Sequence, residues 1–354
     1  MNRAEQDAPG ARGYRMPAEW ERHEATWLSW PHNRETWPGC FEQAESAMVA
    51  LVLALAEHER VRINVLSPEH ELRVSRLLGD RVAPESVQWH RFATNDAWIR
   101  DHGAVFVVRG NGPDPLLALD FEYNAWGGKY PPYDLDQQIA GLMAGALGVP
   151  RYSPGIVLEG GSIDVNGAGV VLMTEQCLLN ANRNPGLDRT GIEAALAGAL
   201  GVTRVIWLGD GIAGDDTDGH VDDLTRFVAR DTVVTAIEPN TADPNHAPLR
   251  ANRERLAAVE FADGTALEIV ELPMPEPLFA GSRRLPASYA NFYIGNETVA
   301  VPVFGCAEDA RACGILGSCF PGKRIVPIDC SALVVGLGAL HCLTQQLPAV
   351  PRTV

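Results

Sequence analysis

Three short motifs and one cysteine carry the side chains of this chain that could do chemistry together. The motifs contain Asp101, Glu159, and the pair His220 and Asp222, and Cys342 stands near the end of the 354-residue sequence. A cysteine thiolate is a nucleophile, a histidine can move protons, and carboxylates bind a planar cation through charge-assisted hydrogen bonds. Together these residue types predict attack of a thiolate on a guanidinium group.

Cys342 follows a turn that contains Gly336 and Gly338, and we predict a strand over residues 339–344. Glycine permits close approach of the backbone to a ligand, which suits a nucleophile. The alternative is that Cys342 is a small buried hydrophobic residue, as most cysteines in apolar strands are. Because side chains alternate along a strand, we expect His341 to point away from the site and to be the weaker candidate for the base.

His220 stands two residues before Asp222, so on a strand both side chains would lie on one face and reach one pocket. A proton-transferring imidazole would then sit beside a cation-binding carboxylate. A metal site is the alternative for the acidic residues 215–223. That segment lacks the glycine and the terminal glutamate of an EF-hand loop, and we predict no metal.

Asp101 and Glu159 complete the predicted guanidinium site. Asp101 comes three residues after Trp98, which could wall the pocket and contact a cation through its ring. The alternative is that Asp101 pairs with Arg100 or with a nearby backbone amide. Glu159 precedes two glycines, which again allow close approach of the backbone. Two carboxylates on the edges of the guanidinium would hold its carbon in line for attack.

The order of predicted elements suggests an α/β protein with five similar units. Each unit begins with small or turn residues, continues as a strand through a polar site residue, and then turns back or enters a helix. An Asn-Gly pair at 166–167 between two β-branched runs is a strong hairpin signal. The five strand segments begin near residues 98, 159, 219, 288 and 338.

Helices are predicted between and before these segments, over residues 41–58, 68–78, 136–147, 188–200, 248–259 and 307–314. A unit repeated at this period indicates a closed radial array. The alternative is a mixed α/β sheet in which the spacing is coincidental. Residues 1–15 are predicted to be a flexible leader, and residues 16–354 a single catalytic domain.

Composition limits the class of protein. The formal net charge of −16 opposes binding to nucleic acid and suits a cationic small molecule, although it also fits an ordinary solvated surface. The seven cysteines include no C-x-x-C pair, and no secretory signal or membrane-length apolar run is visible. We therefore expect a cytoplasmic enzyme with free thiols, no cofactor, no membrane partner and, as an open possibility, a homo-oligomeric state.

Seven motifs in register give the chain a resemblance to the agmatine deiminases and to the wider bacterial peptidylarginine-deiminase-type family. They span nearly the whole sequence and read MPAEW (16–20), TWLSWP (26–31), WIRDHG (98–103), NAWGGKY (124–130), EGGSID (159–164), DTDGHVD (216–222) and HCLTQQ (341–346).

The resemblance implies the pentein fold, a five-bladed α/β propeller with fivefold pseudosymmetry. It implies that Cys342 attacks the guanidinium carbon of agmatine and forms a covalent amidino-cysteine intermediate, with His220 as general acid and base. It also implies that Asp101 and Asp222 hold the guanidinium and that Glu159 supports the histidine. A further set is expected to contact the substrate, namely Trp98, Trp126 and Asp216.

The resemblance implies hydrolysis of agmatine to N-carbamoylputrescine and ammonia, a step toward putrescine, without a cofactor. Three alternatives remain at the level of the sequence. The substrate could be free or peptidyl arginine, the amidino group could pass to an amine, or the fold could bind guanidino compounds without catalysis.

Overall fold

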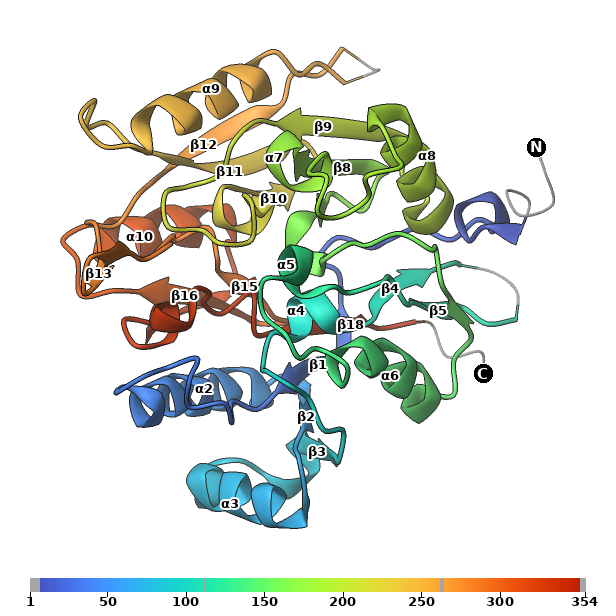
Figure 1. Cartoon of the computed structure of the whole chain (residues 1–354), viewed down its shortest axis with the longest axis vertical. Coiled ribbons are helices and arrows are strands. Elements are labelled where there is room, and N and C mark those ends of the chain that lie inside the picture. Colours follow the sequence, from blue (N-terminus) through green and yellow to red (C-terminus); the bar gives the residue numbers. More distant parts are fainter. Residues whose placement is uncertain (1–6, 111–112, 262–263, 351–354) are drawn as a thin grey trace.

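The computed structural model describes residues 7–110, 113–261 and 264–350 and has a mixed α/β architecture (Figure 1). The strands are β1 (His23–Ser29), β2 (Arg60–Asn64), β3 (Val87–His90), β4 (Val105–Val108), β5 (Leu116–Leu119), β6 (Arg151–Tyr152), β7 (Asp164–Val165), β8 (Val170–Thr174), β9 (Arg204–Leu208), β10 (Thr225–Ala229), β11 (Thr232–Ile237), β12 (Glu268–Pro273), β13 (Phe279–Ala280), β14 (Arg283–Arg284), β15 (Tyr293–Ile294), β16 (Thr298–Val303), β17 (Arg324–Asp329) and β18 (Gln345–Pro348).

The longer helices are α2 (Phe41–Ala56), α3 (Pro68–Leu78), α6 (Ile139–Leu147), α8 (Arg189–Leu200), α9 (His246–Ala257) and α10 (Asp309–Cys319). The short ones are α4 (Ile99–His102), α5 (Ala125–Gly128) and α7 (Glu175–Leu178), with 3-10 turns that include η5 (Gly160–Ser162) and η6 (Val221–Asp223).

Five of the sheets share one plan. In each, two antiparallel strands are followed along the chain by a long helix and then by a strand that pairs parallel to the second. The sheets have the orders β4-β5-β6, β7-β8-β9, β10-β11-β12, β15-β16-β17 and β18-β1-β2-β3. The last sheet joins the two ends of the chain, because β18 pairs with β1. Figure 1 shows the long helices toward the outside and α4 near the middle of the view.

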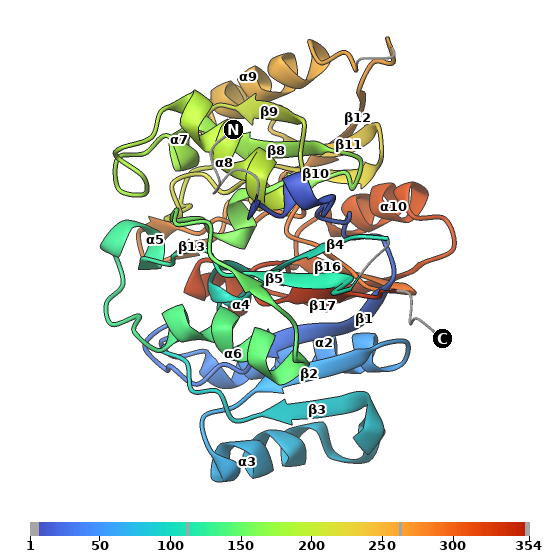
Figure 2. The ribbon, with the colours of Figure 1, turned by 90° about the vertical axis from the view of Figure 1, so that its right-hand side faces the viewer.

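Most predicted helices are confirmed, because good helix formers carry the amphipathic pattern that packs against a sheet. α3 covers residues 68–78 as expected, with the Ser67 side chain accepting the N–H of His70 at its start. The hairpin predicted at 166–167 joins β7 to β8, and Gly167 has the positive φ (69°) that such a turn requires. Figure 2 shows α3 and β3 at one end of the molecule and α9 at the other.

The strands predicted to carry the site residues begin later in the structure than the sequence suggested, so that part of the prediction is wrong. Asp101 lies in the helical turn α4, Asp222 in η6, and Cys342 in a turn before β18. In the last case the Thr344 hydroxyl donates to the carbonyls of Leu340 and His341 (both 3.0 Å), which curls the segment predicted to be extended. The polar site residues therefore lie in turns that lead into the first strand of each unit.

The segment 7–15, predicted to belong to a flexible leader, is packed against the body of the molecule. Tyr14 is buried, and Arg15 and Val108 exchange backbone hydrogen bonds of 2.9 and 2.8 Å. An aromatic side chain and a paired backbone explain why this polar stretch is held. The remainder of that predicted leader, residues 1–6, lies outside the described residues.

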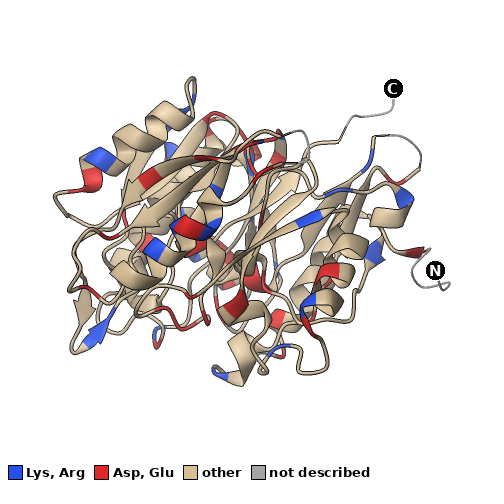
Figure 3. Cartoon of the chain, turned by 90° about the horizontal axis from the view of Figure 1, so that it is seen from above, with Lys and Arg blue, Asp and Glu red and all other residues tan. Residues whose placement is uncertain are grey.

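Hydrophobic clusters fill the space between the sheets and their helices. Residues of both charge signs are distributed along the chain over the whole molecule (Figure 3). All seven cysteines are free thiols, as predicted. Of the helices in the described ranges, none combines the length and the apolar character needed to cross a membrane.

Candidate active site

A cavity of about 580 Å³ opens beside the turn that holds Cys342. Five of the eight predicted site residues line it, namely Trp98, Asp101, Trp126, Asp216 and Cys342. The other three, His220, Asp222 and Glu159, are buried, with side chains at most 1% exposed. The fold thus brings together residues that are up to 244 positions apart, from Trp98 to Cys342.

Cys342 lies at the base of the cavity, and 7% of its surface is exposed. Its Sγ is 3.7 Å from Asp222 Oδ2, to which the thiol donates. Burial, together with the charges of Asp222, Asp223 and Asp101, raises the pKa of the thiol well above its usual value. The turn next to Cys342 requires glycine at position 338, since a Cβ there would lie 2.5 Å from the Trp98 ring. Without a bound cation, the thiol form is favoured.

Asp101 is fixed from two directions. Its Oδ1 accepts the backbone N–H of Gly161 (3.0 Å), and its Oδ2 accepts the indole N–H of Trp126 (2.9 Å). Burial raises the pKa of Asp101 to about 6, with the charge of His220 opposing the shift and the neighbouring carboxylates adding to it. Arg100 is turned away toward Gln346, so the alternative Asp101–Arg100 pair does not form, whereas the alternative pairing with a backbone amide does.

His220 lies between carboxylates. Its Nδ1 is 3.8 Å from Asp101 Oδ1, and its Nε2 is 4.0 Å from Glu159 Oε2. Gly161 makes this arrangement possible: a Cβ at that position would stand 2.7 Å from His220 Nδ1, 2.9 Å from Asp101 Oδ1 and 3.0 Å from Asp222 Oδ2. The absence of a side chain at Gly161 therefore allows three predicted site residues to converge.

Glu159 is neutralised by a residue that the sequence did not suggest. Arg183 donates from Nε to Glu159 Oε1 (2.6 Å) and from Nη1 to Asp218 Oδ2 (2.7 Å), and its side chain is fully buried. The buried ion pair leaves Glu159 Oε2 directed toward His220. This geometry supports the predicted contact of Glu159 with the histidine, and the pairing with Arg183 uses its other oxygen.

The prediction that His341 points away from the site is wrong. Its Nδ1 lies 2.7 Å from Asp222 Oδ2 and its Nε2 lies 2.8 Å from Glu19 Oε2. Because both ring nitrogens face carboxylate oxygens, both contacts are favourable when the imidazole carries two protons. Burial opposes ionisation of Asp222, but the hydrogen bond and charge of His341 and the charge of His220 outweigh it and lower its pKa.

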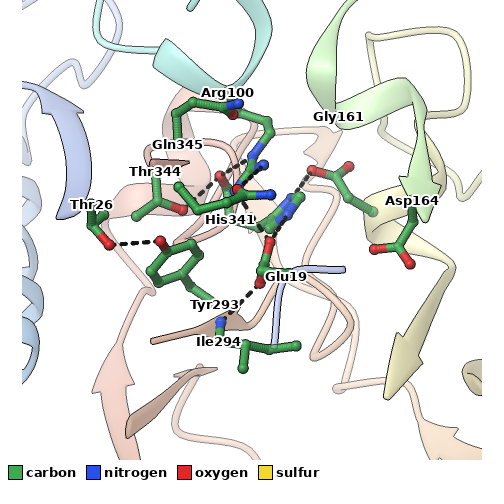
Figure 4. A network of polar contacts seen from close by, with 12 residues as sticks. Glu19, Thr26, Arg100, Gly161, Asp164, Tyr293, Ile294, His341, Thr344 and Gln345 are labelled. Carbon is green, nitrogen blue, oxygen red and sulfur yellow. Dashed lines mark hydrogen bonds and ion pairs between the residues drawn. The ribbon is translucent and has the colours of Figure 1, made fainter. Parts of the chain in front are cut away.

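Glu19 contacts the ring nitrogen of His341 that is opposite the one facing Asp222, and it belongs to a network of buried polar contacts (Figure 4). Its Oε1 accepts the backbone N–H of Ile294 (2.8 Å) and pairs with Arg226 (3.0 Å), while its Oε2 pairs with Arg100 (3.3 Å). Burial disfavours the charged carboxylate, but Arg226 and His341 outweigh that cost and hold the pKa of Glu19 well below its usual range. The network fixes the ring of His341 and, through it, Asp222.

Trp126 reaches Asp101 from an unusual backbone. It has φ 56° and ψ 45°, and Ala125 before it has φ 53°, so two consecutive non-glycine residues occupy the left-handed region. Such conformations persist where the surroundings hold them, and they cluster at functional sites. The side chain of Asn124 accepts the N–H of Gly127 (2.8 Å) and closes this turn.

Asp216 lines the same cavity, and its side chain is partly exposed. It accepts the hydroxyl of Tyr130, lies 3.3 Å from Arg283 Nη2 and 4.0 Å from Lys129 Nζ. Its carboxylate is therefore shared among basic and phenolic neighbours, and it is more exposed than the other predicted site residues.

The acidic segment 215–223 builds a loop. Asp215 Oδ1 accepts the N–H of Thr217 (2.8 Å), and its Oδ2 accepts those of Gly219 (2.9 Å) and His220 (3.1 Å). Among the described residues, one group has its donor atoms close enough to hold a metal, and it consists of Glu159, Cys177 and His220. The guanidinium of Arg183 already occupies Glu159, so the donor set suits this internal cation better than a metal ion.

The sequence interpretation assigned no role to three further residues, Glu19, Arg183 and Asn291. Glu19 belongs to the MPAEW motif, so a signal existed for it. Asn291 lies in the segment predicted to begin near residue 288, and its Nδ2 is 3.1 Å from Cys342 Sγ. Arg183 had no signal, because an arginine in a loop rich in asparagine and glycine gives no pattern that separates a buried pair from a solvated side chain.

The comparisons with known proteins agree over most of the chain. A family model described as Porphyromonas-type peptidyl-arginine deiminase matches residues 15–348. An agmatine deiminase of Ectopseudomonas mendocina is 38% identical, and one of Pseudomonas fluorescens is 37% identical. In both cases the alignment covers 96% of this chain and 97% of the relative.

Solved structures show the same similarity. The agmatine deiminase of Enterococcus faecalis superposes with a TM-score of 0.89 at 32% identity, covering 96% of this chain and 97% of that one. An agmatine deiminase of C. jejuni, in which a cysteine is replaced by serine and the substrate is bound, gives a TM-score of 0.86 at 32% identity with the same coverage.

Proposed function

The chain belongs to the Porphyromonas-type peptidyl-arginine deiminase family, and from that premise we propose that it is an agmatine deiminase, which hydrolyses agmatine to N-carbamoylputrescine and ammonia. The observation that carries the proposal is the thiol of Cys342 at the base of a cavity, with the carboxylates of Asp101 and Asp222 beside it. A thiol surrounded by negative charge suits a cationic carbon centre.

In the first half of the reaction, the thiol proton of Cys342 passes to His220, and the thiolate attacks the guanidinium carbon. Asp101 and Asp222 hold the N–H edges of the guanidinium, and its positive charge offsets the carboxylates that disfavour the thiolate. Asp222 Oδ1 is buried and has no hydrogen-bond partner among the described residues, so it is free to accept from the substrate. His220 gives a proton to the departing nitrogen, the C–N bond breaks, and ammonia leaves.

In the second half, the amidino group remains bound to the sulfur of Cys342. His220, now without its extra proton, takes one from a water molecule that attacks the amidino carbon. The C–S bond then breaks, the hydroxyl proton is released to solvent, and the product leaves as a urea. The thiolate is regenerated and takes back a proton from His220. Glu159, fixed by Arg183, orients the imidazole through both halves.

The lining of the cavity supports a substrate whose far end is a cation. Among the described residues it contains five carboxylate side chains and one basic side chain, Arg283, which is already paired with Asp216. Agmatine ends in an amine, whereas arginine carries an α-carboxylate. Burying that carboxylate among acidic groups without a partner is costly, which favours agmatine. Trp98, Trp126 and the partly exposed Asp216 line the cavity and are placed to contact the substrate.

The repeated plan of the five sheets supports a closed five-bladed propeller with fivefold pseudosymmetry, formed by one catalytic domain over residues 16–354. We place the enzyme in the cytoplasm, acting on a small molecule without nucleic acid, membrane or cofactor. The reaction is a step toward putrescine.

The test is ammonia release from agmatine, arginine and a blocked arginine peptide. We expect kcat/KM for agmatine to exceed the other two by several orders of magnitude, and Cys342→Ser to lose turnover while keeping its circular dichroism spectrum. Equal turnover of arginine or the peptide would reassign the substrate. Absence of ammonia from all three would favour a binding protein, and ammonia-free transfer to an added amine would favour an amidinotransferase.

A further inference from the structure

One of the five repeated segments, residues 288–294, has no part in the proposed reaction. The other four supply Asp101, Glu159, the pair His220 and Asp222, and Cys342. In the structure this segment forms the turn that leads into β15, and it carries Asn291, which is 1% exposed. Its position in its unit therefore corresponds to that of the site residues in the others.

The hydrogen bonds of Asn291 determine which way its amide faces. Oδ1 accepts the backbone N–H groups of His341 (3.0 Å) and Cys342 (3.4 Å). An amide oxygen is required there, since a nitrogen would face two donors. The NH₂ group must then lie on the other side, where it donates to Cys342 Sγ (3.1 Å) and to Asp223 Oδ1 (2.9 Å).

The other contact of the Cys342 sulfur shows which protonation state the Asn291 N–H favours. The thiol donates to Asp222 Oδ2 at 3.7 Å, and that contact becomes repulsive once the sulfur is ionised. Among the described residues, the side chains that hydrogen-bond with Sγ are those of Asp222 and Asn291. Asn291 is thus the side chain whose contact with the sulfur strengthens when the thiol loses its proton.

We propose that Asn291 is a catalytic residue that donates an N–H to Cys342 Sγ, stabilises the thiolate and, through its carbonyl, fixes the turn that presents it. The role rests on the proposed function, since it serves a nucleophilic Cys342. The amide carries no charge, so it stabilises the thiolate without repelling the guanidinium. When the proton leaves the thiol, the N–H···S contact becomes charge-assisted, and when the sulfur forms its bond to carbon the contact weakens again.

The experiment measures ionisation of Cys342 without any guanidino substrate. Alkylation by iodoacetamide is followed by mass spectrometry of the peptide that contains Cys342, as a function of pH, in the full-length protein and two variants. Asn291→Ala removes donor and acceptor, whereas Asn291→Asp keeps the acceptor for the two backbone N–H groups and removes the donor. The matched control is Asn252→Ala, because Asn252 is also 1% exposed and is hydrogen-bonded through both its amide oxygen, to Gly209, and its NH₂ group, to Asp210.

We expect the midpoint of the alkylation curve to rise by about one to two pH units in both Asn291 variants, which means alkylation about 10- to 100-fold slower at pH 8. In Asn252→Ala the midpoint should stay unchanged. An unchanged midpoint in the folded Asn291→Ala protein, or an equal shift in the control, would overturn the proposal. A shift in Asn291→Asp alone would also overturn it, because added charge would then be the cause. None of these outcomes depends on whether agmatine is the substrate.

Discussion

Asp101 combines two properties that make its ionisation measurable in the rate. Burial, together with the charges of Asp222 and Glu159, raises its pKa to about 6 against the opposing charge of His220, and it must be ionised to bind a guanidinium. Above pH 6 the anion is present, and below pH 6 the proton occupies the site that the substrate cation needs. We expect kcat/KM to fall about tenfold per pH unit below 6.

Asp101→Asn should remove this acid limb and lower kcat/KM at neutral pH by about 10- to 100-fold, given roughly 1.5–3 kcal/mol for a charge-assisted hydrogen bond. The measurement is kcat/KM for agmatine between pH 5 and 8 in both proteins. A limb that persists in the variant would assign it to a different group.

His341 gives a second prediction at the scale of one residue, and it reverses what the strand pattern suggested. The strand pattern predicts a mild effect, whereas the bridge between Glu19 and Asp222 predicts a severe one. His341→Gln removes the cation that lowers the pKa of Asp222, so we expect a loss in kcat/KM of about 10- to 100-fold and an acid limb displaced to higher pH. The control is His58→Gln at an exposed histidine. A normal pH profile in His341→Gln would contradict this role.

The elements explain why the residue types could be predicted from the sequence and their conformations could not. The helices α2, α3 and α8 follow from amphipathic runs with clear start and stop signals, and they lie within two residues of their expected ends. The turns that hold Asp101, Asp222 and Cys342 are stabilised by contacts between units, such as the N–H of Arg100 with the carbonyl of Cys342 (3.2 Å). A local pattern contains no record of such partners.

Gly161 offers a test of how one element positions the site. In Gly161→Ala the new Cβ would push against His220, Asp101 and Asp222, so we expect at least a hundredfold loss in kcat with the fold retained. Gly145→Ala is the matched control, since Gly145 is exposed in α6 with open space around it. Alanine there should leave kcat unchanged and stabilise the protein by about 0.5–1 kcal/mol. Comparable activity in the two variants would mean that the turn at Gly161 adapts.

At the scale of the whole molecule, Glu19 connects several units through one carboxylate. It contacts Arg100 before β4, Arg226 on β10, Ile294 on β15 and His341 before β18. The sequence placed Glu19 in a motif, but only the assembled fold shows that segments from four units meet at this one side chain. The same carboxylate thus serves both stability and the position of Asp222.

Glu19→Gln keeps the size of the side chain and removes its charge, which leaves Arg226, Arg100 and His341 buried with less compensation. Breaking a buried ion pair in this way costs about 3–5 kcal/mol, so we expect the free energy of unfolding in a denaturant titration to fall by that amount. The control is Glu21→Gln two residues away, whose partner Arg15 is 43% exposed and whose loss should cost at most about 1 kcal/mol.

The pH dependence of this loss identifies its cause. The pKa of Glu19 is lowered by folding, so its stabilisation is fully present above the unfolded value of about 4.3 and is lost as the pH falls through the folded value. The difference in unfolding free energy between wild type and Glu19→Gln should therefore be constant from about pH 6 to 8 and shrink below about pH 4. A difference that does not change with pH would show that packing, and not the buried charge of Glu19, holds these units together.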